Sequence, residues 1–201
     1  MKRTDKQQRA GVELRAAERA EGREDGGLRI EGKAISFDSP TLIYTDMRGV
    51  DYYEVIDAHA LDGADTDDCC LRYNHSLGVM VLARTRGGSL RLEKRSDGMH
   101  FTAELFDTSV SRDVYELVRQ EALQCSFAFL LPPEGGYRYD ADTHTRTITR
   151  IERLIDLSVV DVPAYKDTFV QARSLFELDS AEEAARLESR ARRRALIART
   201  I

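Results

Sequence analysis

The chain has 201 residues, with 30 Lys and Arg against 35 Asp and Glu, and a formal net charge of −5. This length suits one domain with appendages, and 42% hydrophobic with 32% charged residues excludes a fibrous or wholly disordered protein. No apolar run approaches the roughly 20 residues that span a bilayer, and the first residues lack the apolar segment of a secretory signal. The three cysteines form no CxxC pair, which argues against a disulfide framework. We expect a soluble cytoplasmic protein.

Charge divides the chain into three parts. These parts are residues 1–25, 26–179 and 180–201. As domains, residues 1–25 are a polar N-terminal appendage and residues 172–201 an Arg- and Glu-rich C-terminal tail, and we expect both to be helical or disordered because neither has a wide apolar stripe. Residues 26–179 carry 17 basic and 26 acidic side chains, so nucleic acid is an unfavourable partner for this part. The arginines of 190–194 could contact nucleic acid or an acidic partner, although a solvated helical tail is the simpler interpretation.

Residues 26–171 predict one mainly β domain with a few helices, an α+β fold whose core is antiparallel and barrel-like. Short segments of alternating polarity are separated by turn signals such as Arg86-Gly87-Gly88. One helix interrupts them at Ser111–Leu123, with apolar residues at helical spacing and Ser109 or Ser111 as its N-cap. The predicted strands are Leu28–Phe37, Tyr52–Asp57, Leu71–Tyr73, Val79–Arg84, Ser89–Lys94, Met99–Phe106, Gln124–Leu131, His144–Glu152 and Leu154–Val160.

Neither the histidines nor the acidic residues form a metal-ligand pattern. The four histidines, at positions 59, 75, 100 and 144, include no pair at i and i+4. The aspartates between residues 62 and 68 lack the order of an EF-hand and its closing Glu, which favours a solvated loop. We expect no metal and no cofactor.

Ser126 is the first candidate for chemistry. In Gln124–Leu131, alternation places Cys125 on one face of the strand and Ser126 with Ala128 on the other, where small side chains leave room for a substrate. No GxSxG elbow surrounds Ser126, which excludes the α/β-hydrolase arrangement. A serine in an apolar strand is also common as a hydrogen-bonded core residue, and that interpretation stays open.

Two further residues could act with this serine. His75 follows a short apolar run, and Asp156 lies in the apolar segment Ile155–Val162. A carboxylate in such a segment is costly unless it is paired, and a histidine is a natural partner. Ser126, His75 and Asp156 could therefore form a Ser-His-acid triad, although spacing alone does not prove it.

The order of the segments resembles the prohead proteases of HK97-type tailed phages, a serine-peptidase family related in fold to the herpesvirus assemblins. The resemblance covers about residues 28–170. Each block is weak by itself, and their order and spacing together are specific. The blocks are Ile30–Phe37, Glu54–Ala60, Asn74-His75-Ser76, Val81–Thr85, Gly88–Leu92, Asp97-Gly98-Met99, Cys125–Phe129, Asp156–Val160 and Pro163-Ala164-Tyr165.

Position by position, the resemblance implies catalytic roles for three side chains. His75 matches the histidine of the family's Asn-His motif, and Ser126 matches the family's serine. Asp156 stands where the family usually has a glutamate, so Asp161 and Glu152 remain alternatives for the third member. Other departures from the family are Ser76, where an acid is common, and Ala83 and Ala128, which replace usual glycines.

The function that the resemblance implies is a serine endopeptidase of virion maturation. Its substrates would be the scaffold or scaffold-like region of the major capsid protein and the protease itself, cleaved inside the procapsid in the host cytoplasm. Arg84 or Arg86 could contribute to the site, although solvated arginines are the simpler interpretation. No membrane partner is expected, nucleic acid is not favoured, and a homo-oligomer is left open.

Two alternatives belong to other classes of protein. The first is a non-catalytic capsid-assembly or scaffold module of the same fold, favoured by the departures at Asp156, Ser76 and Ala128. A serine-directed probe would distinguish it from a protease. The second is a β-barrel binding domain in which His75 and Ser126 are unrelated core residues, and it predicts that these two side chains lie far apart.

Overall fold

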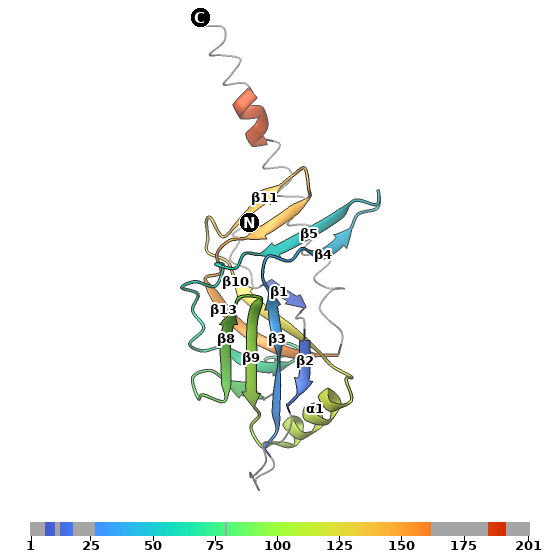
Figure 1. Cartoon of the computed structure of the whole chain (residues 1–201), viewed down its shortest axis with the longest axis vertical. Coiled ribbons are helices and arrows are strands. Elements are labelled where there is room, and N and C mark those ends of the chain that lie inside the picture. Colours follow the sequence, from blue (N-terminus) through green and yellow to red (C-terminus); the bar gives the residue numbers. More distant parts are fainter. Residues whose placement is uncertain (1–6, 11–12, 18–26, 79, 162–184, 192–201) are drawn as a thin grey trace, which may run out of the picture.

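The computed structural model describes residues 7–10, 13–17, 27–78, 80–161 and 185–191. These residues form three β-sheets with open edges and a helix, α1, that closes one end of the body (Figure 1). Figure 1 shows the β2-β3-β9-β8 sheet crossing the sheet that contains β10 and β13, with β4, β5 and β11 at the end opposite α1. Within the described residues, no helix is long and apolar enough to cross a membrane.

A five-stranded sheet in the order β1-β10-β13-β6-β7 carries the candidate site residues. Its pairs are antiparallel except β13 with β6, which are parallel. The inner strand β13 is buried along almost its whole length, as its near-continuous apolar sequence predicts. The strands are β1 (Gln7–Ala10), β6 (Cys70–Tyr73), β7 (Ala83–Arg84), β10 (Gln124–Leu130) and β13 (Arg153–Val160).

A four-stranded antiparallel sheet in the order β2-β3-β9-β8 packs against the first sheet. Gly32 in β3 lets β2 approach closely, because a Cβ at this position would lie 2.0 Å from the carbonyl oxygen of Glu13. Buried residues from both sheets, such as Ile30, Phe101 and Phe127, belong to one continuous core. The strands are β2 (Glu13–Ala16), β3 (Arg29–Ser36), β8 (Leu90–Arg95) and β9 (Gly98–Glu104).

The third sheet has the order β11-β12-β5-β4 and contains a buried ion pair. The parallel pairing of β12 with β5 places Arg146 beside Glu54, both almost fully buried, with Nη1 and Oε2 3.6 Å apart. The guanidinium of Arg146 also lies over the ring of Tyr137, 4.1 Å from its centroid. The strands are β4 (Thr41–Thr45), β5 (Asp51–Ile56), β11 (Tyr137–Asp140) and β12 (Thr145–Ile148).

Helix α1 (Ser109–Arg119) confirms the one internal helix that the apolar spacing predicts. It buries Val114 and Val118 on the side that faces the core. The predicted cap is wrong: Thr108 is the N-cap, and its side chain accepts a hydrogen bond from the backbone N–H of Ser111. A threonine with extended backbone geometry can cap as a serine does, so three hydroxyl residues within positions 108–111 left the start of the helix ambiguous.

The mainly β, α+β class is confirmed, and most predicted strands appear within two residues of their expected bounds. The expectation that residues 1–25 are helical or disordered is wrong at residues 7–10 and 13–16, where the structure has β1 and β2. Pairing with distant strands, which local sequence does not reveal, determines these two elements. Residues 185–191 are helical and exposed. The predicted domain boundaries at 25/26 and 171/172 lie outside the described residues and stay a prediction.

Candidate active site

The strand order of the five-stranded sheet brings two of the candidate residues to one face. β13 lies between β10 and β6, and its register places Ser158 opposite Ser126 and Asp156 opposite Ala128. Residues 156 and 158 are two apart in one strand, so their side chains share a face. Ser126, Ser158 and Asp156 are all fully buried. The small side chain of Ala128 therefore stands beside the carboxylate, and the Ser126 hydroxyl stands one row away from it.

His75 reaches the same face from the turn that follows β6. The backbone N–H of Ser76 donates to the carbonyl of Tyr73 at 3.0 Å, and the two central residues of this turn, Asn74 and His75, have φ of +49° and +52°. Positive φ at both central positions is the pattern of a type I′ turn. Arg72 donates through Nη1 to the carbonyl of Ser76 at 3.3 Å and braces the turn. Left-handed backbone at consecutive non-glycine residues is costly, and such strain is concentrated at functional sites.

The imidazole of His75 joins the other two side chains. Its Nε2 lies 2.6 Å from Oγ of Ser126, and its Nδ1 is hydrogen-bonded to Oδ1 of Asp156. The side chain of His75 is only 7% exposed, and that of Asp156 is not exposed at all. The structure thus brings all three candidate residues together and places the imidazole between the hydroxyl and the carboxylate. The alternative in which His75 and Ser126 are unrelated core residues is wrong.

Ser158 is a fourth member of this cluster, and the sequence interpretation missed it. Its Oγ accepts a hydrogen bond from the backbone N–H of His75 at 3.1 Å and donates one to Oδ1 of Asp156 at 3.0 Å. One hydroxyl therefore holds both the main chain of the histidine and the carboxylate that the imidazole contacts. The signal was available in principle, because Ser158 follows Asp156 at the strand period of two.

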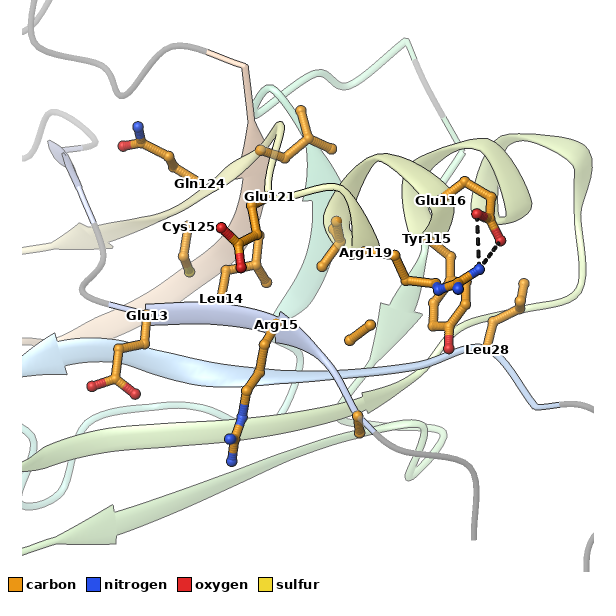
Figure 2. Close-up of a pocket in the computed structure, with 14 residues that line it drawn as sticks. Glu13, Leu14, Arg15, Leu28, Tyr115, Glu116, Arg119, Glu121, Gln124 and Cys125 are labelled. Carbon is orange, nitrogen blue, oxygen red and sulfur yellow. Dashed lines mark hydrogen bonds and ion pairs between the residues drawn. The ribbon is translucent and has the colours of Figure 1, made fainter.

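Cys125, the neighbour of Ser126, faces the other side of β10. It lines a cavity of 1060 Å³ between β2 and α1, together with residues such as Leu14 and Tyr115 (Figure 2). Burial raises the pKa of the Cys125 thiol to about 12. Since a thiol must ionise to act as a nucleophile, Cys125 is unsuited to that role, and the cavity it lines lies on the face away from His75.

The other charged residues considered from the sequence have structural partners. Arg84 forms two hydrogen bonds with Asp68, at 2.6 and 2.7 Å, which hold the pKa of the Asp68 carboxyl below its usual range. Arg86 lies 3.8 Å from the same carboxylate. Asp161 and Glu152, the alternative acids, are exposed just beyond the two ends of β13, whereas the Nδ1 atom of His75 is bonded to Asp156.

Aspartates in the segment 62–68 contact different basic side chains. Asp62 contacts both His59 and Lys94, and Asp65 lies 3.3 Å from Arg153. These contacts agree with the interpretation of the segment as a polar loop. Across the residues that the structure describes, no group of three or more His, Cys, Asp or Glu side chains could hold a metal ion.

This arrangement has the parts of a serine acyl-transfer site. A hydroxyl within hydrogen-bond distance of an imidazole can lose its proton to Nε2 as it attacks a carbonyl carbon. A buried carboxylate at Nδ1 fixes the tautomer in which Nε2 is the acceptor and stabilises the imidazolium that forms. Each of these roles needs the geometry that His75 has, with one ring nitrogen on each partner.

The comparisons with known proteins concern the chain as a whole. A family model described as caudovirus prohead serine protease matches residues 12–183. No curated protein matches the chain. Among solved structures, the capsid assembly protease of bacteriophage T4 is similar over 80% of this chain and 100% of its own, with 11% sequence identity and a TM-score of 0.49.

Proposed function

The chain belongs to the caudovirus prohead serine proteases, and from this premise we propose that Ser126 is its nucleophile, His75 its general base and Asp156 the acid of its triad. The observation that carries the proposal is the imidazole of His75, which contacts Oγ of Ser126 through Nε2 and Oδ1 of Asp156 through Nδ1. Family membership gives the class of chemistry, and this geometry supports the choice of residues.

The proposed reaction is acyl transfer in two stages. Ser126 Oγ attacks the scissile carbonyl carbon as its proton passes to Nε2 of His75, and the imidazolium then gives that proton to the leaving amine. The acyl-enzyme that remains is hydrolysed when His75 takes a proton from water and returns it to Ser126. Asp156 keeps its negative charge throughout and orients the ring.

The proposed substrates are proteins of the assembling capsid. We infer that the enzyme cleaves the scaffold region of the major capsid protein and also its own chain, within the procapsid in the host cell. The family's description as prohead proteases supports this site of action. The acidic middle of the chain, with 26 acidic and 17 basic side chains between residues 26 and 179, favours protein over nucleic acid as the partner.

Labelling with a fluorophosphonate, followed by peptide mass spectrometry, tests the nucleophile directly. We expect adduct on Ser126 in the wild type, none in Ser126→Ala, and normal labelling in Cys125→Ala, which serves as the matched control from the adjacent position. Cleavage of the major capsid protein is measured in parallel. Failure of the wild type both to label and to cleave would support the alternative, a non-catalytic assembly module of the same fold.

A further inference from the structure

The outer neighbour of the strand that carries Ser126 is a segment from the start of the chain. β1 pairs antiparallel with β10 in a register that places Ala10 opposite Ser126 and Gln7 opposite Phe129. β1 is an edge strand of the five-stranded sheet, and among the described strands it is the one that pairs with this side of β10. Figure 1 shows β1 beside β10.

This strand lies outside the part of the chain that the family model matches. The match begins at residue 12, and β1 ends at Ala10. The matched part of this chain therefore includes β10 and excludes β1. Removed from this chain, β1 would leave a row of unpaired backbone N–H and C=O groups along the strand of the nucleophile, and such an edge accepts another extended segment.

An exposed edge of this kind is a recognised way for proteins to bind extended peptides, because main-chain hydrogen bonds supply affinity for any sequence. Ser126 is fully buried in the present arrangement, yet a protein substrate must place its scissile carbonyl at Oγ. A segment of the substrate that replaced β1 would run directly alongside Ser126.

We propose that the outer edge of β10 is the binding site for an extended substrate segment, and that residues 7–10 of the same chain occupy it as an exchangeable strand. This inference rests on the proposed function and adds to it the place where the substrate binds. The described chain is then a latent form, in which substrate competes with β1 for the edge.

The sequence of β1 suits a strand that can leave. Gln7-Gln8-Arg9-Ala10 has four residues and lacks β-branched and aromatic side chains, which are the ones that favour strands. By contrast, β10 and β13 contribute several buried apolar residues each to the core. A four-residue edge strand forms few ladder hydrogen bonds, and such an element opens at low free-energy cost. If only a fraction of the molecules have β1 detached from β10, the apparent affinity for substrate is the intrinsic affinity multiplied by that fraction.

Two single proline variants of the full chain, Gln8→Pro and Arg9→Pro, test the exchange. Successive N–H groups in a strand point to opposite sides, so one of these two residues donates to β10 and the other points away from it. Proline removes a ladder bond only at the inward position and is tolerated at the outward one. The double variant Gln8→Ala with Arg9→Ala keeps both N–H groups and is the matched control.

The expected result is asymmetric. One proline variant labels at Ser126 and cleaves capsid protein about three- to tenfold faster than the wild type, while the other proline variant and the alanine control match the wild type. Thermal unfolding is measured on all four proteins. Equal rates of labelling and cleavage in all four proteins would overturn the proposal. A proline variant with slower cleavage and an unfolding temperature lower by several degrees would also overturn it, because β1 would then be a structural strand.

A binding measurement separates this proposal from the catalytic one. A fluorescent peptide with the sequence of residues 1–11 is titrated into Ser126→Ala proteins that carry either the activating proline or the alanine pair. We expect saturable binding to the proline protein and none to the alanine protein, with a scrambled peptide as control. Equal binding to both proteins, or to neither, would overturn the strand exchange whether or not Ser126 is the nucleophile.

Discussion

Ser126 and Cys125 are adjacent in the chain and opposite in environment. The Ser126 hydroxyl lies 2.6 Å from the imidazole of His75, whereas the Cys125 thiol lines the cavity near α1 with a pKa raised to about 12 by burial. We therefore expect Ser126→Ala to reduce cleavage by at least about 10³-fold without loss of fold. Cys125→Ala should retain activity, and thiol reagents at pH 8 should not inhibit the native enzyme. Loss of activity in Cys125→Ala alone would contradict this assignment.

His75 and Asp156 should differ in how much activity their loss costs. Removal of the base by His75→Ala should cost about as much as Ser126→Ala, because the members of a triad act as a unit. Asp156→Asn keeps the shape but favours the wrong imidazole tautomer, so we expect a loss of roughly 10³–10⁴-fold with measurable residual activity. Steady-state rates on capsid protein measure both, and an Asp161→Asn variant with a larger defect than Asp156→Asn would count against Asp156.

The dependence of the rate on pH should reveal a neutral imidazole as the base. Only neutral imidazole can accept the Ser126 proton, because a protonated ring has no free acceptor at Nε2. We expect kcat/KM to fall in acid solution, where protonation of the ring removes the base. A rate that stays flat down to pH 4 would rule out this mechanism, provided that circular dichroism shows the fold intact over the same range.

Ser158 should act as a positioning residue through its two hydrogen bonds, to the backbone N–H of His75 and to Asp156. Ser158→Ala should lower kcat about ten- to hundredfold with little change in KM, since a hydrogen bond to a charged group is lost. The carboxylate then loses a donor and attracts the imidazolium more strongly, so the acid limb of the pH profile should move to higher pH. Ser158→Thr retains the hydroxyl and should restore both kcat and the wild-type pH profile. If the acid side of the pH profile of Ser158→Ala matches that of the wild type, Ser158 contributes only packing.

At the scale of elements, sequence patterns predicted strands where the alternation is strong, as in β3, β9 and β10. They missed β4 and β11. They also missed β1 and β2, whose polar sequences become strands only through partners far along the chain. The alternation of β10 correctly separated Ser126 from Cys125. No pattern predicted the turn that carries His75, because its positive φ values occur at Asn74 and His75 rather than at glycines. Strand alternation and the carboxylate in an apolar segment suggested the three site residues, the family resemblance supported the choice, and their contacts required the structure.

The pairing of β5 with β12 should depend on the buried Glu54–Arg146 ion pair. Glu54→Gln removes the carboxylate that lies 3.6 Å from the buried guanidinium of Arg146, so we expect the free energy of unfolding to fall by about 3 kcal/mol. The double variant Glu54→Leu with Arg146→Met removes both charges and should be markedly more stable than Glu54→Gln. Urea denaturation measures all three proteins, and equal stability of the single and double variants would contradict this interpretation.

At the scale of the whole molecule, the polar tail after the last strand is a candidate for self-cleavage. Residues 185–191 form an exposed helix, and proteolysis concentrates in exposed terminal segments. Copies of the enzyme enclosed in a procapsid would meet such tails at very high effective concentration. We expect loss of C-terminal mass after Tyr165, within residues 172–195, in aged wild-type protein but not in Ser126→Ala. Identical intact masses in both, with capsid cleavage still active, would contradict self-processing there.

The central place of β13 also governs when catalytic competence can arise during synthesis. β13 is the last strand among the residues that the structure describes, yet it lies between β10 and β6 and supplies both Asp156 and Ser158. A nascent chain on the ribosome that has emerged only as far as β10 already holds Ser126 and His75, but it lacks the strand that joins their elements into one sheet. The proposed catalytic centre therefore cannot assemble before residue 160 has been translated and folded, so the order of the strands would protect host proteins near the ribosome from an incomplete enzyme.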